Sequence, residues 1–277
     1  MAECSEVAKG GGAGEDRVVV LEDEAGVRCA AVVDGATDKS GRDHGGVTGG
    51  ALAAEEVVRT LRRLDPGSGP DAGVTALTEG MRLLRSRWGV GQDDPAGPCA
   101  VVAVAWPRDG VVWRVGDVHV ALGHEDGSWE RHAGEKAVDR VLADTRAAYL
   151  HALLASGTSA GELARDDPGR ELIMPVLRRQ GALANRDGRF GYGVVDGRAV
   201  PPRFVDVLKL RGDCRDVVLA SDGYLRAAPT LQIAERELAS SLRADPLRIG
   251  EFPATKGVPP GAGSFDDRAY LRLVRRS

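Results

Sequence analysis

The sequence predicts an α+β fold in which helices are layered on antiparallel sheets. Runs of strand-forming residues alternate with runs of helical periodicity, whereas parallel sheets need strands and helices that alternate one by one. Asp-Gly turns such as Pro107-Arg-Asp-Gly110 join neighbouring apolar runs, and these turns are typical of antiparallel hairpins. The pattern contains no internal repeat and no convincing domain boundary, so we expect one domain over residues 15–277.

The first half of the chain predicts a hairpin followed by two helices. Residues 1–14 are polar and rich in glycine, and we expect them to form a flexible segment. Two strands, 17–21 and 28–33, flank an acidic turn. Apolar residues at helical spacing then predict helices over about residues 47–64 and 74–88.

The second half predicts a three-strand meander, a helical insert and a return to strands. The meander lies within residues 100–122. Residues 135–180 have helical character, which is interrupted at Gly157 and at Asp167-Pro168-Gly169. The remaining elements are strands at 204–210 and 217–221, a helix at 231–242 with Thr230 as its N-cap, and a last strand at 269–274.

The composition is that of an ordinary globular protein. The 277 residues (29.2 kDa) are 43% hydrophobic and 28% charged. A net charge of −4 gives no electrostatic reason to expect nucleic acid or an anionic membrane as a partner. Cationic side chains are almost all arginine, with only five lysines, a bias that codon composition can explain.

The cysteines and the N-terminus indicate a cytoplasmic protein. The four cysteines are scattered without a Cys-x-x-Cys pair, which disfavours a disulfide framework or a zinc cluster. The N-terminus has neither the basic nor the apolar region of a signal peptide. No apolar run approaches the ~18 residues of a membrane span.

Three acidic positions at the ends of predicted buried strands are the strongest functional signal. Asp34 and Asp222 each follow an apolar run and precede a glycine, and Asp266 precedes the last strand. Any single Asp-Gly pair could be a hairpin turn. Carboxylates that converge beside buried strands repel one another unless a cation neutralises them, and oxygen-only sites suit Mg²⁺ or Mn²⁺. Two such ions can activate a bridging water and hold a phosphoryl group.

The order of the acidic motifs resembles the metal-dependent PP2C protein phosphatases of the PPM family. The motifs are Glu15-Asp16, Val-Val-Asp34-Gly35, Val-Gly116-Asp117, Ala-Ser-Asp222-Gly223 and Asp266-Asp267. Each motif is weak by itself, but five in this order with suitable spacing are together fairly specific. The resemblance implies an αββα four-layer sandwich, with two central antiparallel sheets flanked by helices.

The resemblance also implies the residues of a two-metal site. Those residues are Asp34, Gly35, Asp222, Asp266, Asp16 and Glu15. In the family, the first aspartate bridges two Mg²⁺ or Mn²⁺ ions, and the carbonyl of the glycine after it binds one of them. Asp222 and Asp266 would complete the shell of the second ion, and the acids of the first motif would act through metal-bound water. A water that bridges the metals attacks phosphorus in the family, without a covalent phosphoenzyme.

Three departures from the family pattern mark this chain as a divergent member, and a milder one, Asp266-Asp267 for the usual Asp-Asn pair, is also familiar among bacterial members. Gly11 stands where the family usually has an arginine that grips phosphate, and the nearest upstream cation is Lys9. The loop after the first Asp-Gly begins Ala36-Thr37-Asp38-Lys39 instead of being glycine-rich. Arg226 replaces an acid that helps to hold a third ion in the family.

These departures supply candidates for phosphate binding and proton transfer. Arg226 could bind phosphate through its guanidinium, or it could cap a helix or pair with a surface acid. Its charge would oppose a third ion at Asp117, where the family often binds one. Lys9 is a second candidate for phosphate binding. His44 could donate a proton to the leaving group, or it could be an ordinary residue of a polar loop.

Three functions remain open at this stage. The first is a Mg²⁺- or Mn²⁺-dependent phosphatase that acts on phosphoserine or phosphothreonine of proteins. The second keeps the metals but acts on a small phosphorylated metabolite, enclosed by the loop at 36–43 and the insert at 135–180. The third is a regulatory binding module with weak or lost catalysis.

Overall fold

Two five-stranded antiparallel sheets form the centre of the molecule. The computed structural model describes residues 2–10, 14–36, 42, 44–65, 67, 69–91 and 94–275. One sheet has the strand order β1-β10-β9-β6-β7 and the other has the order β2-β3-β4-β5-β8. The strands are β1 (Ala2–Val7), β2 (Arg17–Asp23), β3 (Gly26–Gly35), β4 (Ala100–Trp106), β5 (Val111–Val115), β6 (His119–His124), β7 (Trp129–His132), β8 (Val205–Lys209), β9 (Cys214–Ala220) and β10 (Arg268–Val274). All neighbouring strands in the two sheets pair antiparallel.

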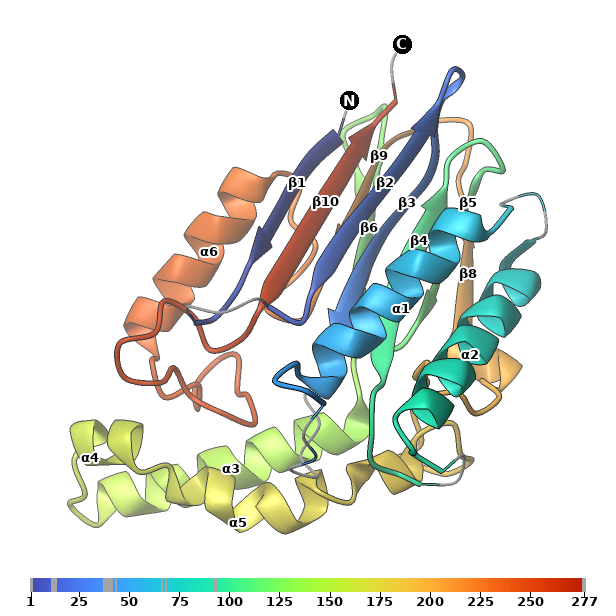
Figure 1. The fold of residues 1–277 in the computed structure, drawn as a ribbon. Helices are drawn as coiled ribbons and strands as arrows, with labels where there is room; N and C mark the ends of the chain where they lie inside the picture. The colour runs from blue at the N-terminus through green and yellow to red at the C-terminus, as the bar shows by residue number, and fades with distance from the viewer. Residues whose placement is uncertain are drawn as a thin grey trace.

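Helices cover both outer faces of the sandwich and one of its ends (Figure 1). The helices are α1 (Gly49–Arg63), α2 (Gly69–Arg87), α3 (Ala137–Ala155), α4 (Ala160–Arg165), α5 (Pro168–Leu177) and α6 (Leu231–Ala244), with short 3₁₀ turns at Gln180–Leu183 and Pro202–Phe204. Helices α1 and α2 pack on the sheet that contains β3 and β4, and α6 packs on the sheet that contains β9 and β10. The predicted α+β fold, an αββα sandwich, is confirmed.

The central strands are apolar throughout because both of their faces are buried. In β4, Val102 and Val104 face α1 and α2, whereas Val101 and Ala103, which alternate with them, face the other sheet. A strand that is covered on both faces has no polar side, so its sequence does not alternate. This explains the continuous apolar run Ala100–Trp106.

The N-terminal segment differs from the prediction. Residues 2–7, expected to be flexible, form strand β1, which pairs antiparallel with β10 at the edge of its sheet. An edge strand is held by backbone hydrogen bonds on one side only, so a polar sequence can form it. The short strand β7 was also not predicted, whereas the hairpin of β2 and β3 and the N-cap Thr230 of α6 were.

The predicted helical insert forms three helices across one end of the sandwich (Figure 1). Arg146 of α3 is completely buried, and its Nη2 lies 2.7 Å from Oδ2 of Asp167, the N-cap of α5. Arg146 Nη1 also donates to the carbonyls of Leu247 (2.9 Å) and Ala254 (3.1 Å). The insert is therefore anchored to the loop that follows α6.

None of the helices in the described part of the chain has the length and apolar character needed to cross a membrane.

Candidate metal centre

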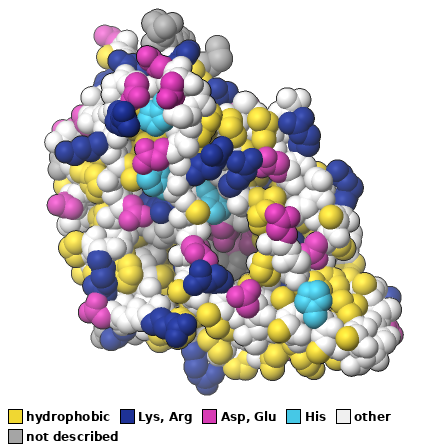
Figure 2. All heavy atoms as spheres, turned by 180° about the vertical axis from the view of Figure 1, so that it is seen from behind, with side chains coloured by type: hydrophobic (Ala, Val, Ile, Leu, Met, Phe, Trp, Pro, Cys, Tyr) yellow, Lys and Arg dark blue, Asp and Glu magenta, His cyan; other side chains and the backbone are white. Residues whose placement is uncertain are grey.

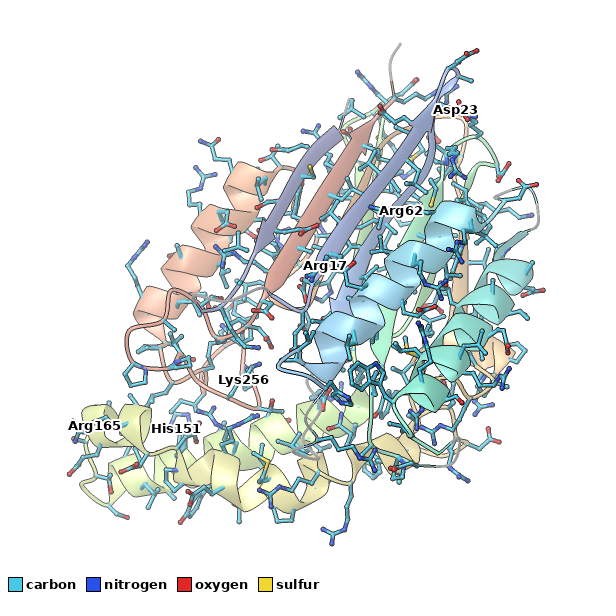
Figure 3. The ribbon with its side chains drawn as sticks, in the orientation of Figure 1. Arg17, Asp23, Arg62, His151, Arg165 and Lys256 are labelled. Atoms are coloured by element: carbon cyan, nitrogen blue, oxygen red, sulfur yellow. The ribbon has the colours of Figure 1, made fainter. Side chains whose placement is uncertain are left out.

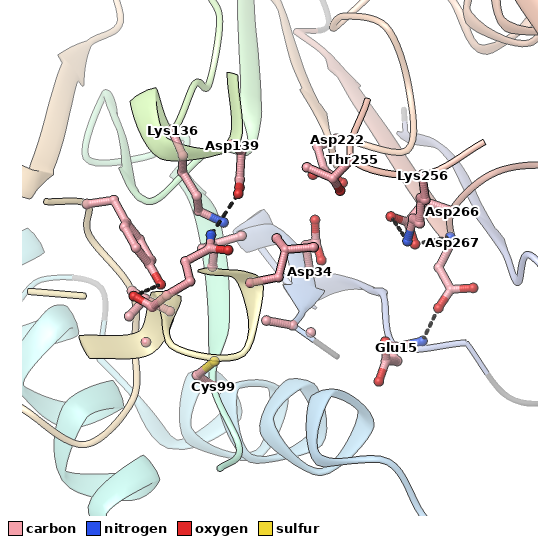
Figure 4. A pocket seen from close by; sticks show the side chains of 18 of the residues that line it. Glu15, Asp34, Cys99, Lys136, Asp139, Asp222, Thr255, Lys256, Asp266 and Asp267 are labelled. Carbon is pink, nitrogen blue, oxygen red and sulfur yellow. Dashed lines mark hydrogen bonds and ion pairs between the residues drawn. The ribbon is translucent and has the colours of Figure 1, made fainter. Parts of the chain in front are cut away.

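A cavity of about 380 Å³ lies where the sheets end and the helical insert begins. The predicted ligands Glu15, Asp16, Asp34, Gly35, Asp222 and Asp266 all line it, together with Lys9. These residues come from four stretches of chain that are far apart in sequence. The cavity seen from close by has Asp34 and Asp222 near its centre and Asp266 with Lys256 to one side (Figure 4). Figure 2 shows a hollow in one face of the molecule, with acidic side chains inside it.

The strand register places Asp34 between the sheets. Val32 and Ala30, two and four residues before Asp34 in β3, face the other sheet, and side chains two residues apart in a strand share a face. Asp34 therefore continues that face at the end of the sandwich. Gly35 is the last residue of β3 and not part of a turn. A Cβ atom at Gly35 would lie 2.2 Å from the carbonyl oxygen of Gly50 and 2.7 Å from that of Glu15, so only glycine allows this approach.

The second Asp-Gly pair is explained by the same kind of close contact. A Cβ atom at Gly223 would lie 1.9 Å from the carbonyl oxygen of Asp267. The glycine thus lets the segment after β9 approach the segment before β10, which brings Asp222 and Asp266 into one cavity. Asp34 and Gly35 are both paired with β4, whereas Asp222-Gly223 forms a turn in which the N–H of Tyr224 donates to the carbonyl of Ser221 (3.1 Å). Neither pair connects two adjacent strands, so neither is a hairpin turn.

Asp267 fixes the N-terminal segment beside the cavity. Its Oδ1 accepts a hydrogen bond from the backbone N–H of Lys9 (2.7 Å), and its Oδ2 accepts one from the backbone N–H of Glu15 (2.9 Å). Asp267 is buried, and both of its oxygens are used in these bonds. It therefore positions Lys9 and the Glu15-Asp16 motif.

Burial, together with the charges of neighbouring carboxylates, raises the pKa of three acids of the cavity. Burial, followed by the charges of Asp16 and Asp222, raises the pKa of Asp34 well above its usual range. Burial also raises the pKa of Asp16, although a hydrogen bond with Ser221 opposes the shift. Asp222 is exposed to the cavity but surrounded by protein. This enclosure, with Asp117 and Asp266, raises the pKa of Asp222 to about 7.

Two lysines hold the carboxylate of Asp266. Lys9 Nζ lies 3.2 Å from Oδ1, and Lys256 Nζ lies 2.5 Å from Oδ2. Burial would raise the pKa of Asp266, but the charges of Lys256 and Lys9 outweigh it and lower that pKa. The two lysines therefore favour the ionised form of Asp266, whereas the surroundings of Asp16 and Asp34 disfavour ionisation.

A third lysine contacts Asp117, which lies in a neighbouring cavity of about 690 Å³ and does not line the first one. Lys136 Nζ lies 3.0 Å from Asp117 Oδ2, and Lys136 and Asp222 line both cavities. Burial would lower the pKa of Lys136, but the carboxylates of Asp117 and Asp139 outweigh it and raise that pKa. Lys136 therefore remains charged.

The carboxylate oxygens of the cavity are the type of ligand that a hard divalent cation prefers. Seven carboxylates and five cationic side chains line the first cavity, which leaves two negative charges when all are ionised. Oδ2 of Asp16 is buried without a hydrogen-bond partner, which is costly unless a cation binds it. Among the residues that the structure describes, however, no three His, Cys, Asp or Glu side chains form a ready-made metal site. A cation would have to draw the carboxylates together and compete with the lysines.

Two candidate residues lie outside both cavities. The guanidinium of Arg226 pairs with Glu237 of α6, which corresponds to the alternative of a surface ion pair. His44 is buried against the edge of Trp88, with 5.3 Å between the ring centroids. Arg226 as a phosphate ligand and His44 as a general acid therefore have no support in the structure, because neither side chain reaches the cavities. Thr37-Asp38-Lys39, in the divergent loop after Gly35, lies outside the described residues.

Apart from Lys9, the cations that line the cavity are residues that the sequence did not reveal. Lys136, Lys256 and Arg170 line it, and Arg170 Nη1 donates to the carbonyl of Thr255 (2.7 Å). Lys256 lies beside the helical insert, at the opposite end of the sandwich from Asp23 (Figure 3). The available signal was the scarcity of lysine, because three of the five lysines (9, 136 and 256) face this acidic site.

Solved structures with the same fold are bacterial serine/threonine phosphatases. Stp1 from Staphylococcus aureus is 13% identical, with a TM-score of 0.51 over 100% of this chain and 96% of that chain. The PPM Ser-Thr phosphatase MsPP from Mycobacterium smegmatis, in complex with cacodylate, is 15% identical, with a TM-score of 0.51 over 100% of this chain and 98% of that one. The catalytic domain of the serine/threonine phosphatase PstP, in complex with two manganese ions, is 18% identical, with a TM-score of 0.50 over 100% and 98% of the two chains.

These likenesses show the fold. No family model matches the sequence, and no curated protein sequence matches it either. The chain therefore has the fold of PP2C-type phosphatases, at an identity too low for the fold to carry the activity with it.

Proposed function

We propose that this protein is a metal-dependent phosphomonoesterase. The observation that carries the proposal is the convergence of acidic side chains from four distant segments on one cavity, where burial and mutual repulsion raise the pKa of Asp16 and Asp34. Such crowding is unfavourable in a metal-free protein and is relieved by a divalent cation. Perturbed carboxylates in a cavity are also typical of functional sites.

The residues that would hold two Mg²⁺ or Mn²⁺ ions are the acids of the cavity. Asp34 and the carbonyl of Gly35 would form the centre of the site, Asp222 and Asp266 would complete it, and Asp16 and Glu15 would support it. Bound ions would supply activation of a water nucleophile and stabilisation of charge on the phosphoryl oxygens. Lys9 remains the candidate for phosphate binding, because its ammonium lines the same cavity.

The substrate that we propose is phosphoserine or phosphothreonine in a protein. The support is the similarity of fold to proteins named serine/threonine phosphatases. A small phosphorylated metabolite is the second candidate substrate. The cationic residues Lys136, Arg170 and Arg178 of the insert line the cavity, and the volume of the cavity is within the range of small-ligand pockets.

A metal-dependent assay tests the activity. With Mn²⁺ and p-nitrophenyl phosphate we expect turnover that EDTA abolishes and that excess Mn²⁺ restores. Turnover that EDTA leaves unchanged would contradict the mechanism. Failure to bind any divalent ion would instead favour a binding module without catalysis.

The same preparation separates the two substrate classes. We expect higher kcat/KM with phosphoserine and phosphothreonine peptides than with a panel of small phosphomonoesters. Preference for one small phosphomonoester over all peptides would favour the metabolite phosphatase.

A further inference from the structure

We propose that Lys136 is a built-in cation that takes the place of a divalent ion at Asp117. The inference rests on the proposed metal centre and concerns how many ions that centre holds. Lys136 Nζ lies 3.0 Å from Asp117 Oδ2, and both side chains are largely buried, with 13% and 7% of their side-chain surfaces exposed. Lys136 also faces the acidic cavity that contains Asp34 and Asp222.

The position of Lys136 is fixed by the packing of the segment before it. Arg114 Nη1 donates to the carbonyls of Val118 (2.9 Å) and His132 (2.8 Å) and so ties the end of β7 to the segment after Asp117. A Cβ atom at Gly134 would lie 1.8 Å from the carbonyl oxygen of Asp117, so the two backbones are in direct contact. The backbone N–H of Gly134 donates to His119 Nδ1 (3.1 Å). These contacts hold the segment that precedes Lys136 against Asp117, and so they place the Lys136 side chain beside the carboxylate.

The ammonium lies in an enclosure suited to a cation. It sits over the ring of Tyr192, 5.4 Å from the centroid, which adds a cation–π contact. Asp139, in the first turn of α3, contributes a further negative charge. The carboxylate of Asp139 is itself held by Gln180, whose Nε2 lies 2.7 Å from Oδ1. The ammonium of Lys136 thus contacts the carboxylate of Asp117 and the ring of Tyr192, and the charge of Asp139 stabilises it further.

A fixed ammonium excludes a divalent ion from the same carboxylate. A lysine is a compact point charge, so a second cation on Asp117 would lie close to it at low dielectric and be repelled. Oδ1 of Asp117 has no hydrogen-bond partner in the described part of the chain, and it can accept a water without adding charge. In a chain that uses arginine for most of its cations, a lysine at this position supplies one positive charge in little space.

Counting bound Mn²⁺ tests the inference. The metal-free protein and three variants, Lys136→Gln, Asp117→Asn and the double variant, are titrated with Mn²⁺ by calorimetry. We expect the wild type and Asp117→Asn to bind the same number of ions. Lys136→Gln should bind one more ion per chain, and the double variant should lose it again. Lys209→Gln, which removes an exposed lysine of β8, controls for the change in net charge and should behave as the wild type.

The outcomes separate this inference from the proposed function. A wild type that binds no Mn²⁺ contradicts the metal centre itself. A wild type that binds Mn²⁺ and loses one ion in Asp117→Asn overturns the role of Lys136 while leaving the metal centre intact. A folded Lys136→Gln variant with the wild-type number of ions also overturns it. Asp117→Asn keeps the test decisive if the lysine variant does not fold.

Discussion

At the scale of single residues, the acids of the cavity differ in the charges that surround them. Asp34 and Asp16 are crowded by like charges, whereas Asp266 is held ionised by Lys9 and Lys256. The acids were predictable because each stands beside an apolar run. Lys136 and Lys256 were not, because they lie at a helix start and in a loop, and only the folded chain shows that they face the acids.

Asp34→Asn should abolish the proposed activity. Loss of a central ligand should lower kcat/KM for p-nitrophenyl phosphate by at least about 100-fold, beyond the effect typical of residues that only support ligands. Asp23→Asn is the matched control, because Asp23 is an exposed residue paired with Arg108 at the far end of the sandwich. Equal rates for wild type and Asp34→Asn would contradict the assignment.

The same substitution should stabilise the metal-free protein. The raised pKa of Asp34 means that ionisation is disfavoured in the folded state, so a penalty is present above the pKa of the unfolded chain, about 4. At pH 8 without metal we expect Asp34→Asn to melt a few °C above the wild type. The difference should shrink as the pH falls toward about 4 and reverse with saturating Mn²⁺. A lower melting temperature without metal would count against the crowding argument.

At the scale of elements, close backbone contacts and one buried arginine assemble the site. The strands were predictable from their apolar runs, and α1, α2 and α6 from their periodicity. Strand β1 was not, because an edge strand needs no apolar face. The contact of Gly35 with Gly50 was also hidden, because sequence shows a glycine but not what approaches it.

Gly35→Ala should damage both stability and activity. The added methyl group would meet the carbonyl oxygen of Gly50, and overpacking of this kind costs about 1–3 kcal/mol or more. Gly161→Ala in α4 is the control, since its Cβ would meet nothing within 4 Å, and alanine there should stabilise by about 0.5–1 kcal/mol. Urea denaturation measures both, and a neutral Gly35→Ala would contradict the close contact.

Arg146→Met should loosen the insert from the sandwich. It would leave the carboxylate of Asp167 and several carbonyls without their partner, at a cost of about 3–5 kcal/mol in the free energy of unfolding. Arg140 is on the same helix as Arg146, and Arg140→Met removes only its exposed ion pair with Glu135, so it should cost less than about 1 kcal/mol. If urea denaturation gave the two variants equal stability, the anchoring role of Arg146 would be wrong.

At the scale of the whole molecule, the order of motifs along the chain predicted the sandwich and the acids at its end. The fold is confirmed, and all six predicted core ligands line one cavity. Arg226 shows where sequence reasoning stopped: its distance from Asp222 along the chain is short, but its side chain turns to Glu237. Proximity in sequence did not fix the direction of a side chain in an irregular segment.

Anomalous diffraction from crystals soaked in Mn²⁺ tests the central claim most directly. The account predicts manganese peaks in the cavity, within coordination distance of Asp34 and Asp222, and no peak at Asp117 beside Lys136. Crystals that are saturated with Mn²⁺ yet show no anomalous peak among these carboxylates would contradict it.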